Sequence, residues 1–434
     1  MLQNFKYSWL CLILLAGAFL RIVPVWTHPE KNIGGLGVFG DTVAFMSTAE
    51  NLVKGAGFSS APDGSVPSML RPPLYPAFLA LCLWVRGWSP DFCRTAQGIL
   101  DAASVFFLFL SARVMCGGRW KNAAGLLAAV LGATCPYLIF FSRQLLSETL
   151  TVFFMSIALY LHLKIHRSGR LSLWALAGAS LALAGLTRPD AGWMAVPLVL
   201  IHLVLLRRDK KKALRPALCM VLGFVLCLVP WTFRNFTLFG RVVPFAGGNL
   251  GLNLYMGTWE ESSLWMEQGW KFPPDSGPPQ EREEVEKIVL MLHKSHAMTG
   301  GSEMFELDAK LFDTAKKRIL QDPWNYAKLC ILRLPRLWWI DPYKKYQITE
   351  PGALPILVYF ILALLGSALL YRSSGGLVLV PWTIIAYVTA VHLPMHVEAR
   401  FSLQGMPALL VLASGAACLD FSSLLTNVYR VKTV

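Results

Sequence analysis

The chain has 434 residues, of which 55% are hydrophobic and 15% are charged, and its mean hydropathy is +0.50. This composition excludes a soluble globular domain and a disordered chain, because neither class carries so much apolar sequence. The net charge of +14 does not indicate a nucleic-acid-binding protein, since residues 232–352 hold 15 acidic and 15 basic residues and the positive excess lies in short segments between apolar runs. The composition therefore predicts an all-α polytopic membrane protein.

The apolar runs define candidate membrane spans, because a helix needs about 20 apolar residues to cross a bilayer. The first run holds Arg21 and no small-residue cleavage site follows it, so we expect an uncleaved anchor rather than a signal peptide. Ten spans with both termini inside is the preferred count, within a range of about 10 to 12. They fall at 8–26, 96–115, 122–141, 148–165, 171–187, 190–206, 213–231, 353–371, 376–393 and 402–419.

Three basic segments set the predicted orientation. "RVMCGGRWK" at 113–121, "KIHRSGR" at 164–170 and "RRDKKKALR" at 207–215 are expected on the cytoplasmic side. Alternation from these points puts residues 27–95, the stretch around 142–148 and residues 232–352 on the outer side of the membrane.

The same alternation argues against a full membrane crossing by residues 72–88. A full crossing by residues 72–88 would reverse the sides of the basic segments, so we expect a half-helix or membrane-edge helix there. The predicted regions of the chain are an N-terminal transmembrane catalytic module at 1–231, a large extracytoplasmic loop or helical subdomain at 232–352, and C-terminal transmembrane helices at 353–434.

The first candidate site residue is Asp41, at the start of a predicted interfacial helix. Residues 42–54 place their apolar side chains on one helical face, as in helices that lie on a membrane surface. Asp41 could be the N-cap of this helix or a catalytic carboxylate at the membrane boundary, and both interpretations stay open.

The second candidate is Arg71, in "SMLRPPLYPAF". Pro72 and Pro73 favour an extended backbone at the arginine and the start of a helix directly after it. Arg71 could be an interface anchor, or it could bind a phosphate through its planar, permanently charged guanidinium.

Further polar candidates lie at the predicted outer ends of other spans. Glu148 begins the fourth predicted span, where it could be catalytic or form an ion pair with Arg143. Arg234 follows a span that ends in Pro-Trp, and Arg400 lies in "HLPMHVEARFS".

The segment around Arg400 also contains two histidines four residues apart. His392 and His396 have the spacing of a metal pair, but Pro394 interrupts a regular helix and no third ligand has a fixed spacing. We therefore assign no metal ligands and no certain cofactor, and a divalent metal stays open.

Taken together, these residues put carboxylates and arginines at one membrane face beside an apolar wall. The sequence has no Walker loop and no dinucleotide fingerprint, so a lipid-borne activated donor is more economical than a nucleotide sugar. A sugar carried on a polyprenyl phosphate fits this combination.

The sequence resembles the GT-C class of membrane glycosyltransferases, close to the group of protein O-mannosyltransferases and aminoarabinose–lipid A transferases. The resembling segments follow one another in family order over about residues 40 to 410. They are "GDTVAFMSTAENLVKG", "RPPLYPAFLA", "SETL", "LTRPDAG", "PWTFRNFTLFG" with "GGNLGLNLYMG", and "EARFSLQGMPALL".

The resemblance implies roles for the candidate residues. Asp41 corresponds to the catalytic base or its close partner, Arg71 to the residue that contacts the carrier phosphate, and Glu148 to the acid of the next outer loop. Asp41 is followed by Thr42, whereas many relatives have Asp-Glu, and an arginine-tyrosine pair common in the family is absent.

The implied reaction is an inverting displacement on the outer face of a membrane, expected to be a bacterial inner membrane. Asp41 would take a proton from an acceptor hydroxyl, and Arg71, with Arg234 or Arg400, would stabilise the departing lipid phosphate. The expected partners are a polyprenyl-phosphate-linked sugar, membrane lipids, and a hydroxyl acceptor on a protein, lipid or glycan.

Two other classes of protein stay open. A transporter or flippase for a lipid-linked sugar would also carry charges at the membrane edge, although such proteins often show internal repeats and broken helices near the midplane. A non-catalytic assembly protein would tolerate joint replacement of the acids and arginines.

Overall fold

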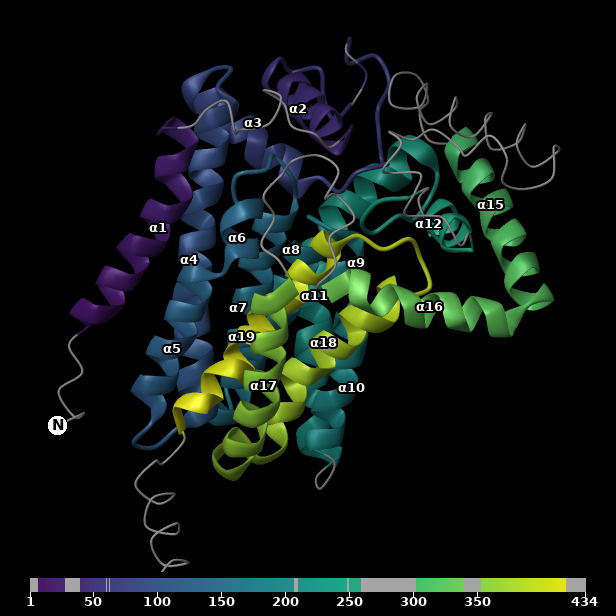
Figure 1. Cartoon of the computed structure of the whole chain (residues 1–434). Coiled ribbons are helices and arrows are strands. Elements are labelled where there is room, and N and C mark those ends of the chain that lie inside the picture. Colours follow the sequence, from purple (N-terminus) through teal and green to yellow (C-terminus); the bar gives the residue numbers. More distant parts are fainter. Residues whose placement is uncertain are drawn as a thin grey trace, which may run out of the picture.

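The structure is a computed structural model that describes residues 7–27, 40–59, 61, 63–206, 210–247, 250–258, 302–338 and 353–418. Within these residues the fold is helical throughout, and the long helices pack side by side into a bundle whose upper end in Figure 1 carries several short helices. The predicted all-α fold is confirmed.

The helices follow one another in this order. The first half of the chain forms α1 (Ser8–Thr27), α2 (Gly40–Val53), α3 (Leu74–Arg86), α4 (Pro90–Cys116), α5 (Lys121–Thr134), α6 (Pro136–Phe141), α7 (Glu148–Ser168), α8 (Leu171–Gly185), α9 (Pro189–Trp193) and α10 (Ala195–Leu205). The second half forms α11 (Lys210–Phe239), α12 (Leu250–Gly257), α15 (Ser302–Gln321), α16 (Pro323–Trp338), α17 (Ala353–Ser374), η3 (Gly375–Val378), α18 (Leu379–His392), η4 (Ala399–Gly405), α19 (Met406–Ala413) and η5 (Ser414–Cys418).

Each of the ten predicted spans corresponds to a helical segment, and two of them are broken. The span predicted at 122–141 divides into α5 and α6 at Pro136, because the residue before a proline is driven out of the helical conformation; Cys135 has φ −61° and ψ 113°. The span predicted at 190–206 divides into α9 and α10, where Trp193 ends the first and Ala195 begins the second.

Six helical stretches in the described part of the chain are long and apolar enough to cross a membrane. They are Ser8–Thr27, Pro90–Cys116, Glu148–Ser168, Ala213–Phe239, Leu354–His392 and Ala399–Cys418. The fifth includes both α17 and α18, and shorter apolar helices lie between the others. The chain is therefore a polytopic integral membrane protein, and the number of its crossings stays a prediction.

The charged residue inside α1 has a buried partner in α4. The guanidinium Nε of Arg21 lies 2.5 Å from Oδ2 of Asp101, and both side chains are at most 1% exposed. The other guanidinium nitrogens donate to the carbonyl oxygens of Gly17, Gly132 and Ala133. A charge within a membrane span costs several kcal/mol unless it is paired, so this network lets α1 remain in the bundle.

The segment at 72–88 forms a short helix, as a half-helix or membrane-edge helix requires. Its helix α3 has 13 residues, which at 1.5 Å per residue extends about 20 Å and is shorter than the roughly 30 Å core of a bilayer. The backbone N–H of Leu74 donates to the carbonyl of Leu186, and the ring of Tyr75 packs edge-on against Phe45 of α2. These contacts fix α2 and α3 together at the upper end of the bundle (Figure 1).

The predicted insertion at 232–352 begins inside a helix, because α11 continues from Lys210 to Phe239. The structure describes α12, α15 and α16 within the insertion, and the rest of it, 259–301 and 339–352, lies outside the described residues. α12 and α15 lie at the upper end of the bundle in Figure 1, on the side away from α1.

The basic ends of the long helices lie at the opposite, lower end of the bundle. α4, α7 and α17 all end there in Figure 1, and their last turns carry Arg113, Arg167 and Arg372 respectively. η5 ends at this same end. The fold thus separates the cationic helix ends from the end that holds α2, α3 and α12.

Candidate active site

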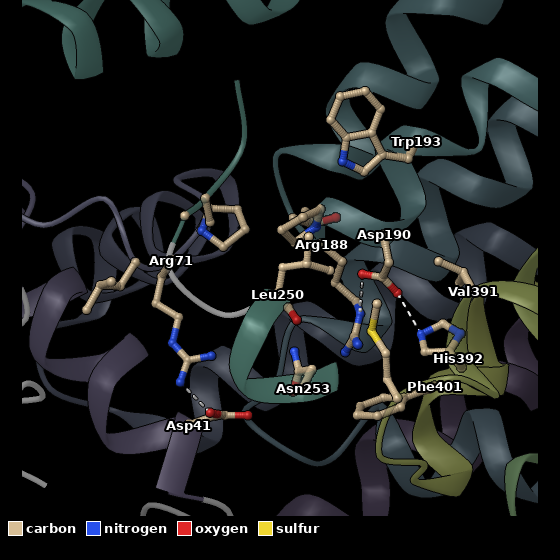
Figure 2. Close-up of a pocket in the computed structure, with 18 of the residues that line it drawn as sticks. Asp41, Arg71, Arg188, Asp190, Trp193, Leu250, Asn253, Val391, His392 and Phe401 are labelled. Atoms are coloured by element: carbon tan, nitrogen blue, oxygen red, sulfur yellow. Dashed lines mark hydrogen bonds and ion pairs between the residues drawn. The ribbon is translucent and has the colours of Figure 1, made fainter. Parts of the chain in front are cut away.

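A cavity of about 550 Å³ opens at the upper end of the bundle. It is built where α2, the turn before α3, the start of α7, the start of α9, α12 and the segment after α18 meet. Figure 2 shows Arg71 and Asp41 on one side of the cavity, Arg188, Asp190 and His392 on the other, and Leu250 and Asn253 of α12 between them. The polar lining residues include Asp41, Arg71, Ser147, Glu148, Thr187, Arg188, Asp190, Asn253, Asp308, His392, His396 and Arg400.

Asp41 lies between two arginines. Its Oδ1 is 2.5 Å from a terminal nitrogen of Arg71, and its Oδ2 is 3.3 Å from a terminal nitrogen of Arg400. Burial disfavours the charged carboxylate, but the two guanidinium groups outweigh burial and hold the pKa of Asp41 well below its usual range. Asp41 is therefore an ionised carboxylate at neutral pH, and it is 27% exposed towards the cavity.

Glu148 starts α7 from a buried position, with 2% of its side chain exposed. Its Oε1 accepts a hydrogen bond of 2.8 Å from Arg188 and lies 3.6 Å from Arg400. Its ion partners are thus Arg188 and Arg400 rather than the Arg143 considered from the sequence. The other carboxylate oxygen, Oε2, is buried and has no hydrogen-bond partner within the described residues.

Arg188 and Asp190 were not singled out from the sequence as site residues, although they lie in the "LTRPDAG" segment. The guanidinium Nε of Arg188 is 3.4 Å from Oδ1 of Asp190. Oδ2 of Asp190 receives hydrogen bonds from His392 at 3.1 Å and from Gln404 at 2.6 Å. An arginine directly before a proline, as at Arg71 before Pro72, was the signal that could have found Arg188.

Arg400 and Glu398 form a second ion pair at the cavity. Nε of Arg400 lies 2.5 Å from Oε2 of Glu398, and Oε1 of Glu398 is 3.0 Å from Nε2 of His396. Burial opposes ionisation of Glu398, but Arg400 and His396 lower the pKa of its carboxyl to about 2. The ring of Phe401 faces the guanidinium groups of both Arg188 and Arg400, at 5.1 and 5.4 Å.

The segment that carries Glu398 and Arg400 is held by the insertion. Arg333 of α16 donates to the carbonyl oxygens of Gly257 and Leu393, and the hydroxyl of Tyr326 donates to the carbonyl of Pro394. The backbone N–H of His396 donates to the carbonyl of Asn253 in α12. These contacts explain how residues more than 350 positions apart in the sequence, Asp41 and Arg400, meet at one site.

The two histidines considered as a metal pair have separate partners. His392 contacts Asp190, and His396 contacts Glu398. Within the described ranges, no group of three or more His, Cys, Asp and Glu side chains is arranged to hold a metal ion. The described residues that line the cavity do not form a fitted metal centre.

Arg234 is the one predicted site residue that does not line the cavity in the described structure. Its guanidinium donates to the carbonyl oxygens of Ser68 and Phe58 at 2.7 and 3.2 Å, and it faces the ring of Trp231 at 4.7 Å. Arg234 thus braces the segment that leads to Arg71. The geometry favours a supporting role for it over direct phosphate contact.

Comparisons with known proteins agree with this fold. A family model described as dolichyl-phosphate-mannose-protein mannosyltransferase matches residues 70–233, which is less than half of the chain. A search among curated proteins finds no significant match.

Solved structures of similar fold include the archaeal oligosaccharyltransferase AglB from Archaeoglobus fulgidus in complex with an inhibitory peptide and a dolichol-phosphate. That structure is 16% identical, with a TM-score of 0.60 over 99% of this chain and 51% of its own length. The apo form of the oligosaccharyltransferase from the same organism gives 15% identity, a TM-score of 0.58, and coverages of 99% and 52%. ArnT from Cupriavidus metallidurans, bound to undecaprenyl phosphate, is 14% identical over 95% of this chain and 78% of its own, but its TM-score of 0.41 is too low to support an argument.

The chain shares its fold with the archaeal oligosaccharyltransferases, and the family model matches residues 70–233. Both findings support the resemblance to the GT-C class of membrane glycosyltransferases that the sequence motifs indicated. The chain spans about half the length of the archaeal oligosaccharyltransferases whose fold it shares.

Proposed function

We propose that this protein transfers a sugar from a polyprenyl-phosphate donor to a hydroxyl acceptor, by an inverting displacement in the cavity at the upper end of the bundle. The observation that carries this proposal is the convergence of Asp41 with Arg71 and Arg400 on a cavity at the end of a membrane bundle. A carboxylate beside cations suits a reaction in which a hydroxyl loses a proton and a phosphate leaves.

The proposed chemistry assigns one role to each side of the ion-paired network. Asp41 accepts the proton of the acceptor hydroxyl while the acceptor oxygen forms a bond to the anomeric carbon. The bond between that carbon and the phosphate oxygen breaks, and the lipid phosphate leaves with the electron pair. Arg71 and Arg400 stabilise the negative charge of the departing phosphate, because guanidinium groups bind phosphate oxygens in a bidentate manner.

Glu148 has a proposed role in the same reaction. Its Oε1 accepts a hydrogen bond from Arg188 and lies 3.6 Å from Arg400, so Glu148 orients these two guanidinium groups at the cavity.

The proposed location of the site is the extracytoplasmic face, expected to be that of a bacterial inner membrane. The cationic helix ends lie at the opposite end of the bundle from the cavity, and cations are retained preferentially on the cytoplasmic side. The gathering of charge at one end also favours an enzyme over a transporter, whose binding site would be expected near the midplane of the bilayer.

The proposal is tested by incubating the purified protein with a panel of polyprenyl-phosphate sugars and identifying products by mass spectrometry. The expected result is release of free polyprenyl phosphate together with a glycosylated protein, lipid or glycan. Analysis of the product's anomeric configuration should show inversion. Flipping of intact donor across a vesicle membrane, without cleavage of the sugar–phosphate bond, would instead establish the transporter.

A further inference from the structure

The proposed base and the proposed phosphate ligand are bound to each other. Asp41 and Arg71 form a 2.5 Å ion pair whose side chains are 27% and 24% exposed, and both line the cavity. The guanidinium of Arg71 also faces the ring of Phe45 at 5.5 Å. In this state a terminal nitrogen of the Arg71 guanidinium donates to a carboxylate and is not available to a phosphate.

This pairing works against both proposed roles. A carboxylate that shares a charge-assisted hydrogen bond with a guanidinium is a weak proton acceptor, because Brønsted behaviour ties its strength as a base to its pKa. The pKa of Asp41 lies well below its usual range, and Arg71 is the largest of the causes that lower it. The structure thus holds the base in a form poorly suited to catalysis.

The backbone around Arg71 leaves its side chain as the part that can change partner. The peptide carbonyl of Met69 accepts a hydrogen bond from Gly247, and the backbone N–H of Leu74 donates to Leu186, so the segment is tied on both sides of the arginine. Pro72 further restricts the backbone. Asp41 keeps a second cation, Arg400 at 3.3 Å, which would hold the carboxylate in place after Arg71 has left it.

We propose that the phosphate of a polyprenyl-phosphate ligand displaces Asp41 from Arg71, so that binding of the donor also releases the catalytic base. This inference rests on the proposed function and adds its order of events. Asp41 becomes a competent base only when a donor phosphate occupies the guanidinium of Arg71. Deprotonation of an acceptor, or of water, without a donor in place is thereby suppressed.

The competition predicts an unusual phenotype for a residue that acts as a base. Asp41→Asn removes the competing charge, so polyprenyl phosphate should bind about 3- to 10-fold more tightly to this variant than to the wild-type protein. In the Arg71→Gln background the same change should tighten binding clearly less, because the contested guanidinium is gone and only the longer contact of Asp41 to Arg400 is left. The measurement is the Kd of polyprenyl phosphate for the four proteins of this double-mutant cycle, in one detergent or nanodisc.

Asp308→Asn is the matched control. Asp308 is another cavity carboxylate, and it accepts a hydrogen bond of 2.9 Å from the backbone N–H of Leu252, a contact that an asparagine oxygen can keep. The Asp308→Asn substitution removes one negative charge from the cavity without changing Asp41 or Arg71. The Kd of polyprenyl phosphate for this variant should therefore equal that for the wild-type protein. Tightening by Asp308→Asn as large as that by Asp41→Asn would reveal general charge repulsion and overturn the exchange.

Two further outcomes separate this inference from the proposed function. If transfer from polyprenyl-phosphate sugars occurs but Asp41→Asn fails to tighten carrier binding, or tightens it equally in the Arg71→Gln background, the exchange is wrong and the transferase stands. If the cycle shows the predicted coupling but no polyprenyl-phosphate sugar is ever cleaved, the exchange stands for a lipid phosphate and the transferase is wrong.

Discussion

At the scale of single residues, the sequence predicted three cavity residues correctly but not the ion partners of Glu148. Asp41, Arg71 and Arg400 were selected because carboxylates and arginines at membrane edges need a reason, and the structure brings them together. The partners of Glu148 could not be chosen in this way, since Arg143 lies close in sequence whereas Arg188 reaches it only when α7 packs beside the turn between α8 and α9. Long-range ion pairs depend on packing that hydropathy does not encode.

Arg188 lines the cavity and Arg234 does not, so replacing each of them tests whether a cation at the cavity is needed for transfer. Arg188→Gln should lower kcat/KM for transfer by about 10- to 100-fold, because it removes a charge-assisted contact to Glu148 and a cation from the cavity. Arg234→Gln is the control, since Arg234 contacts backbone carbonyl groups outside the cavity lining, and it should have the smaller effect. Thermal melting of both variants checks folding, and a larger catalytic loss in folded Arg234→Gln would contradict the assignment.

The depressed pKa values of Asp41 and Glu398 predict how activity depends on pH. Both carboxyls stay ionised as the pH falls from 7 to 5, since the pKa of Glu398 is about 2 and that of Asp41 also lies well below its usual range. The kcat/KM for the donor reports the free enzyme and should therefore show no acidic decline over that range. Stability contributed by these carboxyls should likewise persist above the ordinary carboxyl pKa and be lost only as the pH falls towards the folded-state value.

The pH profile has its own internal control. Arg71→Gln removes the main cation that lowers the pKa of Asp41, so any acidic decline should move to higher pH in this variant. An acidic decline near pH 6 in the wild-type protein that Arg71→Gln leaves in place would show that another group controls activity.

At the scale of elements, apolar length and prolines predicted most helices, and contacts between distant segments decided the rest. Charge alternation predicted a half-helix or membrane-edge helix at 72–88, and α3 there is short. The break between α5 and α6 falls at Pro136 as proline sterics require. Nothing in the sequence indicated that Arg333 of α16 would hold the segment before Arg400, because that contact joins an insertion to a turn about 60 residues away.

The buried ion pair between α1 and α4 gives an element-scale prediction. Arg21→Leu leaves Asp101 as an unpaired buried carboxylate and should destabilise the protein by about 3 to 5 kcal/mol. The double variant Arg21→Leu/Asp101→Leu should recover much of this loss, since it buries two apolar side chains instead. Thermal unfolding in detergent measures both, and a double variant no more stable than Arg21→Leu would show that the hydrogen bonds of Arg21 to backbone carbonyl groups matter more than its ion pair.

At the scale of the whole molecule, a bundle of apolar helices carries a charged cavity at one of its ends. Hydropathy predicted the ten helical segments and the polytopic class, because apolar length alone decides which segments can enter a bilayer. The cavity could not be predicted as a volume, since Asp41, Glu148, Asp190 and Arg400 come from four separate parts of the chain. What the sequence did provide was the chemical class of several lining residues, namely carboxylates and arginines.

The central claim is that Asp41 in this cavity drives cleavage of a sugar–phosphate bond carried by a membrane lipid. Its most direct test is the rate at which purified wild-type and Asp41→Asn proteins release polyprenyl phosphate from a saturating polyprenyl-phosphate sugar in the presence of acceptor. Loss of a general base predicts a rate lower by about 10²- to 10⁴-fold in Asp41→Asn, in protein that thermal melting shows to be folded. Equal rates in the two proteins would contradict the account.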